Sequence, residues 1–283
     1  MNSSLRSRKA RHGSQMTRLR LVNNSLTLMN SSLRSQMRPS ARINSKQSYH
    51  SSEQSEDYLR GATESFASHG ELFYLLPMNG IKHIIFDLGG VLMDIDFKRT
   101  FSAFERMGFK GAEEWFQRPE VHQLCVEFET GVHCPAELRS RFREITGFTC
   151  SDSAFDRAWN ALLIRFPDEH IRRVRELSGK YQTYLLSNTN PIHCKYFNSE
   201  LRKHFGIESL DHLLTKAWYS HKLGLRKPDE RVFRKVLELS RIKPDETLYL
   251  DDVEINLTSA RAVGMQTMLI TPDFSIIEAL KDF

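Results

Sequence analysis

The chain has 283 residues, of which 40% are hydrophobic and 10% aromatic, enough apolar material for one large or two modest globular domains. Its apolar runs fall well short of the roughly 18 residues of a membrane helix, which excludes a spanning protein. The formal net charge is +5, and its distribution decides whether an acidic partner is expected.

Cysteine usage is sparse and irregular. The four cysteines are Cys125, Cys134, Cys150 and Cys194, and none of them forms a Cys-x-x-Cys pair. This spacing indicates neither a zinc ribbon nor a disulfide scaffold. It is compatible with a reducing compartment, so we expect a cytoplasmic protein.

Residues 1–77 are predicted to be a disordered basic extension. Residues 1–52 contain ten Lys or Arg, thirteen Ser and no Asp or Glu, a composition that cannot form a packed core. The net charge is +6 over residues 1–77 and −1 over residues 78–283. We therefore expect neither a nucleic-acid partner nor a membrane partner for the folded part.

Three interpretations of the extension remain open. It could be a basic arm that contacts phosphates, or an Arg- and Ser-rich organellar presequence. Alternatively, Met78 is the true start, and the preceding residues are mistranslated upstream sequence. The heptapeptide MNSSLRS at residues 1–7 recurs at residues 29–35, which favours this third view.

The organised sequence begins at Ile81, with a first strand at His83–Phe86. Residues 97–166 then show four amphipathic stripes rich in Phe and Leu at helical spacing, with no further strand expected. We predict that residues 97–166 are a helical cap inserted into an α/β core made of residues 78–96 and 167–283.

Strands and helices alternate again after the insert. Short apolar runs predict strands at Thr183–Leu186, Leu248–Leu250 and Thr267–Ile270. Helices are expected after Pro167, after Pro228 and before Gly264. Because uniformly apolar strands suit a sheet covered on both faces, the pattern predicts a doubly wound, parallel, Rossmann-like α/β fold.

Polar residues follow the predicted strands where ligands bind in open α/β sheets. In chain order they are Asp87, Gly89-Gly90, Ser187-Asn188, Lys227 and Asp251-Asp252. Converging carboxylates repel one another unless a cation lies between them, and hard oxygen ligands favour Mg²⁺. A lysine and a hydroxyl beside that cluster suit a dianion such as a phosphoryl group.

These segments resemble the four motifs of the haloacid dehalogenase-like hydrolase superfamily, in its phosphatase branch with a helical cap. The resemblance covers residues 81–271 and is closest to bacterial sugar-phosphate phosphatases, including the α-glucose-1-phosphate phosphatase type. The four segments are Phe86-Asp87-Leu88-Gly89-Gly90-Val91-Leu92, Leu186-Ser187-Asn188, Arg226-Lys227-Pro228-Asp229, and Leu250-Asp251-Asp252 followed by Asn256.

The resemblance implies a role for each motif residue. Asp87 is expected to be the nucleophile that forms an aspartyl phosphate. Ser187, the backbone at Asn188 and Lys227 would hold the phosphoryl group. The Mg²⁺ ligands would be Asp87, Asp252 and the backbone carbonyl of Gly89, with Asp251 as a further ligand or as support.

Gly89 departs from the family pattern. Most of these phosphatases carry a second Asp there as general acid and base, which is worth ~10²–10⁴ in rate. Its absence favours substrates with good leaving groups, such as anomeric sugar phosphates. Asp94 or Asp96 could replace the missing acid.

We expect a Mg²⁺-dependent phosphatase of a small phosphorylated metabolite, with a sugar phosphate favoured. Two alternatives remain: a non-catalytic member that binds phosphate or metal, and a metal-independent 2-haloacid dehalogenase. Substrate choice is expected to lie in residues 97–166, near Glu127, Phe128 and Glu129.

Overall fold

The computed structural model describes residues 80–283. The predictions for residues 1–77, and that of a start at Met78, lie outside the described residues. Within the described part, no helix has both the length and the hydropathy to cross a membrane.

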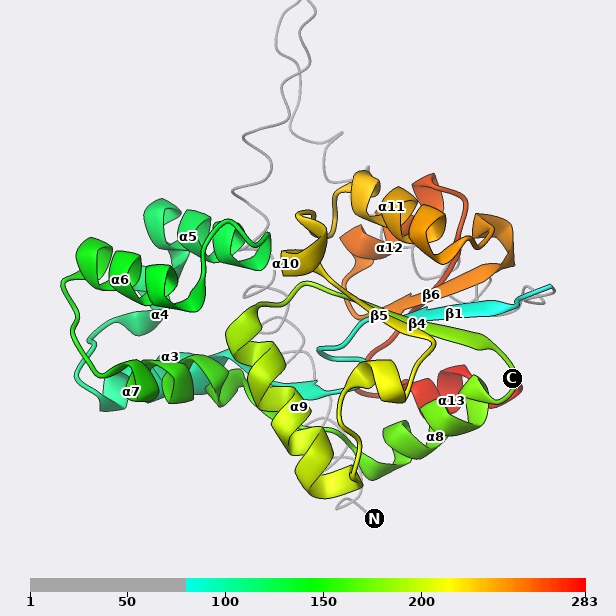
Figure 1. The fold of residues 1–283 in the computed structure, drawn as a ribbon, viewed down its shortest axis with the longest axis horizontal. Coiled ribbons are helices and arrows are strands. Elements are labelled where there is room, and N and C mark those ends of the chain that lie inside the picture. Colours follow the sequence, from blue (N-terminus) through cyan, green and yellow to red (C-terminus); the bar gives the residue numbers. More distant parts are fainter. Residues whose placement is uncertain (1–79) are drawn as a thin grey trace, which may run out of the picture. The chain divides into compact units, whose positions relative to one another are not determined.

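A central sheet of five parallel strands, in the order β5–β4–β1–β6–β7, forms the core (Figure 1). The strands are β1 (His83–Phe86), β4 (Gln182–Ser187), β5 (Lys216–Tyr219), β6 (Thr247–Asp251) and β7 (Gln266–Leu269). Four of them match the predicted strands, whereas β5 has no counterpart among the predictions. The doubly wound parallel α/β fold is confirmed.

Helices flank the sheet on both sides because successive strand residues point to opposite faces. The helices outside the insert are α8 (Asp168–Ser178), α9 (Pro191–Phe205), α10 (Ser220–Leu223), α11 (Glu230–Ser240), α12 (Glu254–Ala262) and α13 (Ile276–Ala279), with 3-10 turns η2 (Leu210–His212) and η3 (Pro244–Glu246). Ile84 and Phe86 share a buried cluster with α8, α9 and α13, and Ile85 shares another with α11 and α12. Figure 1 shows α11 and α12 on one side of the sheet and α8 and α13 on the other.

The helical insert, residues 97–166, follows β2 (Asp94–Ile95). It contains α3 (Phe97–Arg106), α4 (Ala112–Gln117), α5 (Pro119–Glu129), α6 (Pro135–Thr146), α7 (Asp152–Trp159), the 3-10 turn η1 (Asn160–Leu162) and β3 (Leu163–Arg165). β3 pairs antiparallel with β2. The expectation of no strand in this segment is therefore wrong at β3, whose three residues are too few to show the period of a strand.

The predicted aromatic stripes form the core of the helical insert. Phe104, Phe142 and Phe155 are fully buried. Their ring centroids lie 5.2–5.6 Å apart, within the range of favourable aromatic contacts. This cluster is separate from the two clusters beside the sheet.

Candidate active site

The strand register brings the predicted site residues to one edge of the sheet. Phe86 lies opposite Leu185 on β4 and Leu250 on β6. Since the three strands are parallel and in step, the residues after these positions meet at the carboxyl edge. Asp87, Ser187 and Asp251 are all buried there.

Lys227 is the centre of the site. Its side chain is 2% exposed, and its Nζ lies 2.8 Å from Asp87 Oδ1 and 2.7 Å from Asp251 Oδ2. Burial alone would lower the pKa of Lys227, but the carboxylates of Asp251 and Asp87 outweigh burial and raise it. The side chain is therefore an ammonium ion held between two carboxylates.

Both carboxylate oxygens of Asp251 already accept hydrogen bonds. The backbone N–H of Val253 donates to Oδ1 over 2.8 Å, and Asn256 Nδ2 lies 3.1 Å from each oxygen. The Tyr249 hydroxyl also donates to Oδ2, beside Lys227. Asp251 therefore anchors Lys227, and its remaining capacity to bind a metal is small.

Tyr249 also contacts the site, although the sequence analysis gave it no role. It lies two residues before Asp251 on β6, so the two side chains point to the same face of the sheet. Its ring is fully buried, and its hydroxyl reaches the Asp251 carboxylate.

The carboxylates of Asp87, Asp251 and Asp252 form a possible metal group, with one ligand atom from each lying within 4.8 Å of the others. Burial raises the pKa of Asp87 to about 6, with Lys227 opposing the rise and Asp251 adding to it. Burial and the charges of Asp87 and Asp251 raise the pKa of Asp252 to about 8. Such a carboxylate group gains from a nearby cation, and its oxygen donors suit Mg²⁺.

Asn188 connects the loop after β4 to the segment that carries Lys227. Asn188 Oδ1 accepts from the Lys227 backbone N–H over 2.9 Å, and Nδ2 donates to the Lys227 carbonyl over 2.9 Å. The sequence indicated only the backbone of Asn188 as functional. The Asn188 side chain therefore also holds the backbone of Lys227 in place.

The two glycines after Asp87 lie in close contact with their surroundings. A Cβ on Gly89 would lie 2.8 Å from Ile95 Cδ1, the end of a flexible side chain. Gly90 has φ +75°, and a Cβ there would lie 2.3 Å from Asp252 Oδ2. Gly90 therefore allows Asp252 to approach the loop that carries Asp87.

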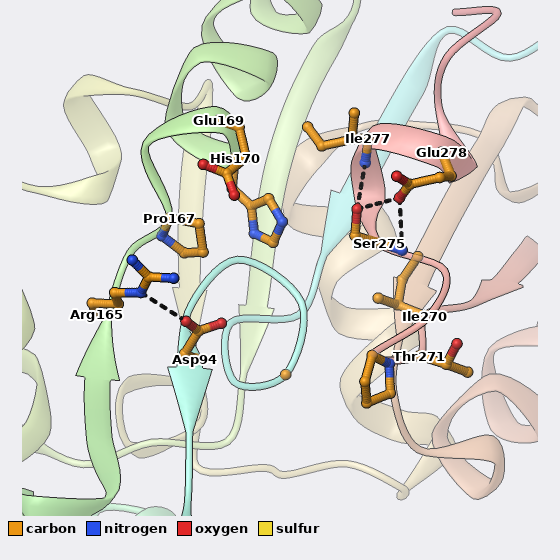
Figure 2. Close-up of a pocket in the computed structure, with 12 residues that line it drawn as sticks. Asp94, Arg165, Pro167, Glu169, His170, Ile270, Thr271, Ser275, Ile277 and Glu278 are labelled. Carbon is orange, nitrogen blue, oxygen red and sulfur yellow. Dashed lines mark hydrogen bonds and ion pairs between the residues drawn. The ribbon is translucent and has the colours of Figure 1, made fainter. Parts of the chain in front are cut away.

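Asp94 and Asp96, the two candidate replacements for the missing acid, both form contacts with residues outside the carboxylate cluster. Asp94 Oδ2 pairs with Arg165 Nε over 3.1 Å, beside a cavity of about 420 Å³ that His170 and Glu278 also line (Figure 2). Asp96 Oδ1 accepts from the Lys98 backbone N–H over 3.0 Å and caps α3. These contacts do not support Asp94 or Asp96 as the general acid.

Comparison with known proteins identifies the family. A sequence model of the haloacid dehalogenase-like (HAD) hydrolases matches residues 81–264. The chain belongs to the HAD-like hydrolase family. This confirms the family expected from the four motifs and the hydrolase class.

Several relatives of this HAD-like hydrolase are named phosphatases. D-ribitol-5-phosphate phosphatase from Bacteroides thetaiotaomicron is 28% identical over 187 residues, covering 66% of this chain and 90% of that protein. Glyceraldehyde 3-phosphate phosphatase from Pyrococcus furiosus is 25% identical over 210 residues, covering 68% and 81% of the respective chains.

Solved HAD structures share the fold of this hydrolase. A HAD family enzyme from Bacteroides thetaiotaomicron, in complex with magnesium and inorganic phosphate, has a TM-score of 0.63 at 35% identity over 67% of this chain and 94% of that one. A HAD-like family hydrolase from Porphyromonas gingivalis has a TM-score of 0.66 at 28% identity, over 72% and 97%.

Proposed function

We propose that this HAD-like hydrolase is a Mg²⁺-dependent phosphatase that acts on a small phosphorylated metabolite through an aspartyl phosphate at Asp87. The observation that carries the proposal is the buried contact of 2.8 Å between the Asp87 carboxylate and the Lys227 ammonium, beside Asp252. The named phosphatase relatives and the magnesium and phosphate complex of a neighbour support it.

The proposed reaction has two steps on Asp87. Its carboxylate oxygen attacks phosphorus, the bond from phosphorus to the substrate oxygen breaks, and that oxygen leaves with the electron pair. Water then attacks the phosphorus of the aspartyl phosphate, which releases inorganic phosphate and restores the carboxylate. Lys227 neutralises the charge on the phosphoryl oxygens, and Ser187 with the backbone of Asn188 holds them.

The Mg²⁺ ion would be held by Asp87, Asp252 and the backbone carbonyl of Gly89. Once bound, it offsets the carboxylate charge and stabilises the negative charge on the phosphoryl group. We assign Asp251 a supporting role, because its oxygens already accept bonds from Lys227, Val253 and Asn256.

The substrate class follows from Gly89 and from the relatives. Without an acidic side chain at Gly89, the leaving oxygen departs most easily when it forms a stable anion, as in an anomeric sugar phosphate. The relatives are named for phosphates of a pentitol and a triose. We propose a sugar phosphate, with an anomeric phosphate favoured by Gly89 over the alkyl phosphates of these relatives, selected by the helical insert acting as a cap over the site.

Hydrolysis of p-nitrophenyl phosphate, with Mg²⁺ and with EDTA, tests the proposed function. We expect turnover with Mg²⁺, loss of turnover in EDTA, and a fall of at least about 10³-fold in kcat for Asp87→Asn. Asp94→Asn is the matched control and should keep full activity, because Asp94 pairs with Arg165 instead. Turnover that survives EDTA, or full activity of Asp87→Asn, would refute the proposal.

A further inference from the structure

The end of α5 contacts the core directly before the catalytic lysine. Glu129, the last residue of α5, places Oε2 3.0 Å from Nη2 of Arg226, the neighbour of Lys227. α5 also packs against α10, and Figure 1 shows the two helices side by side. At Gly131 an added Cβ would lie 2.2 Å from the His221 carbonyl oxygen, so the two backbones approach closely.

This contact continues into the phosphate-binding loop. Ser220, the first residue of α10, donates from Oγ to the Thr189 carbonyl over 3.0 Å and accepts from the Thr189 N–H over 2.9 Å. Thr189 directly follows Asn188, whose side chain forms two bonds with the Lys227 backbone. The helical insert is thus connected to both segments that bind the phosphoryl group.

The Glu129–Arg226 ion pair is partly shielded from solvent. The side chains of Arg226 and Glu129 are 30% and 26% exposed. Arg226 Nε is buried and has no hydrogen-bond partner within residues 80–283. Burial lowers the pKa of His122, which also lies on α5, and the Arg226 charge lowers it further, against the opposing charge of Glu129.

We propose that Glu129 is a positioning residue that, through Arg226, holds Lys227 and the helical insert in one arrangement. Glu129 does not touch the phosphoryl group. It fixes the segment from Arg226 to Lys227, so that docking of the insert and the position of the ammonium at Asp87 depend on each other. This inference rests on the proposed function.

A double-mutant cycle with Glu129→Gln, Arg226→Gln and both substitutions tests the proposal. With p-nitrophenyl phosphate and Mg²⁺, we expect each single variant to lose about three- to tenfold in kcat, with a smaller change in KM. The double variant should be no slower than the slower single variant, because both act through one pair. Glu120→Gln, an exposed change on the same helix, is the control and should match the unmodified protein.

Hydrogen exchange in the metal-free protein supplies a readout that is independent of activity. The amides of Thr130, Gly131 and Val132 bond to carbonyls of α5, so their exchange reports opening of this segment. Glu129→Gln should speed their exchange, and that of residues 225–227, without changing α12.

Faster exchange together with non-additive losses in kcat supports the proposal. Additive losses, unchanged exchange, or an unchanged kcat in Glu129→Gln would overturn it while the unmodified enzyme stays active. Absence of Mg²⁺-dependent turnover in the unmodified chain would instead refute the proposed function, and this inference with it.

Discussion

Lys227 neutralises only part of the charge at the site. Its ammonium pairs with Asp87 and Asp251, whereas Asp252 forms no ion pair within residues 80–283. Asp252 is half-buried, and burial together with the neighbouring Asp87 and Asp251 charges raises its pKa to about 8. Asp252 is therefore the carboxylate whose charge depends most on a bound cation.

We predict that Mg²⁺ binds more tightly as the pH rises towards about 8. Below that pH a proton must leave Asp252 before the ion can bind, so the affinity should rise up to about tenfold per pH unit and level off above pH 8. Calorimetric titration with MgCl₂ between about pH 6 and pH 9 measures this dependence.

The metal-free protein gives the corresponding control. The pKa of Asp252 is raised from 3.8 to about 8 on folding, so its contribution to stability is present below about pH 4 and is lost as the pH rises to about 8. In EDTA the melting temperature should fall over this range, and Asp252→Asn should flatten the fall. A Mg²⁺ affinity that does not change with pH would contradict the assignment.

Gly89→Asp should increase the rate most for substrates with poor leaving groups. The new carboxyl would supply the general acid that the glycine lacks, a gain that p-nitrophenol, already a good leaving group, needs least. The added Cβ would lie 2.8 Å from Ile95 Cδ1, so the substitution is best made together with Ile95→Val, which removes that atom.

Ile95→Val alone is the matched control for this variant. Comparison of p-nitrophenyl phosphate with an alkyl phosphate, such as a polyol phosphate, measures the preference. An equal change for both substrates would argue against the leaving-group explanation.

The chain order of the motifs identified Asp87, Ser187, Lys227 and Asp252, because residues after parallel strands meet at one edge of the sheet. The motif order does not predict how the polar side chains are oriented. No motif encodes the atomic positions that let Asn188 bind the Lys227 backbone. The same is true of the hydrogen-bond donors that surround the Asp251 carboxylate. The site assignments themselves stay predictions.

Four of the five strands, including β7 at one edge of the sheet, were predictable because each contains a short apolar run. β5 was missed because it starts with an exposed lysine, Lys216, and contains none of the Val, Ile or Leu residues that mark the four predicted strands. α9 was missed because its buried residues Ile192, Phe197 and Leu201 are five and four positions apart, which breaks the usual helical stripe. α10 and α13 are too short to show any period.

The aromatic cluster should dominate the stability of the helical insert. Phe104 is fully buried among Phe109, Phe116, Phe142 and Phe155, so Phe104→Ala should lower the free energy of unfolding by about 3–5 kcal/mol. Phe97→Ala, at a side chain that is 42% exposed on the same helix, should cost less than about 1 kcal/mol. Urea unfolding measures both changes, and equal losses would show that the cluster is not the core of the insert.

The net charge of +5 is distributed unevenly along the chain. Residues 78–283 carry −1, and the +6 of residues 1–77 lies outside the described part. Under the proposed function, we therefore expect a phosphate dianion to be attracted by the local site, through the Lys227 ammonium and a bound Mg²⁺. The division into an α/β core and a cap stays a prediction. The sequence suggests it because the spacing of apolar residues changes from that of strands to that of helices over residues 97–166.

Direct capture of the phosphorylated nucleophile tests the central claim. Borohydride added during turnover of p-nitrophenyl phosphate with Mg²⁺ reduces an aspartyl phosphate to homoserine, which peptide mass spectrometry locates. We predict homoserine at Asp87, and none in the absence of substrate. Continued turnover with an unmodified Asp87, or with homoserine at another aspartate, would contradict the proposed mechanism.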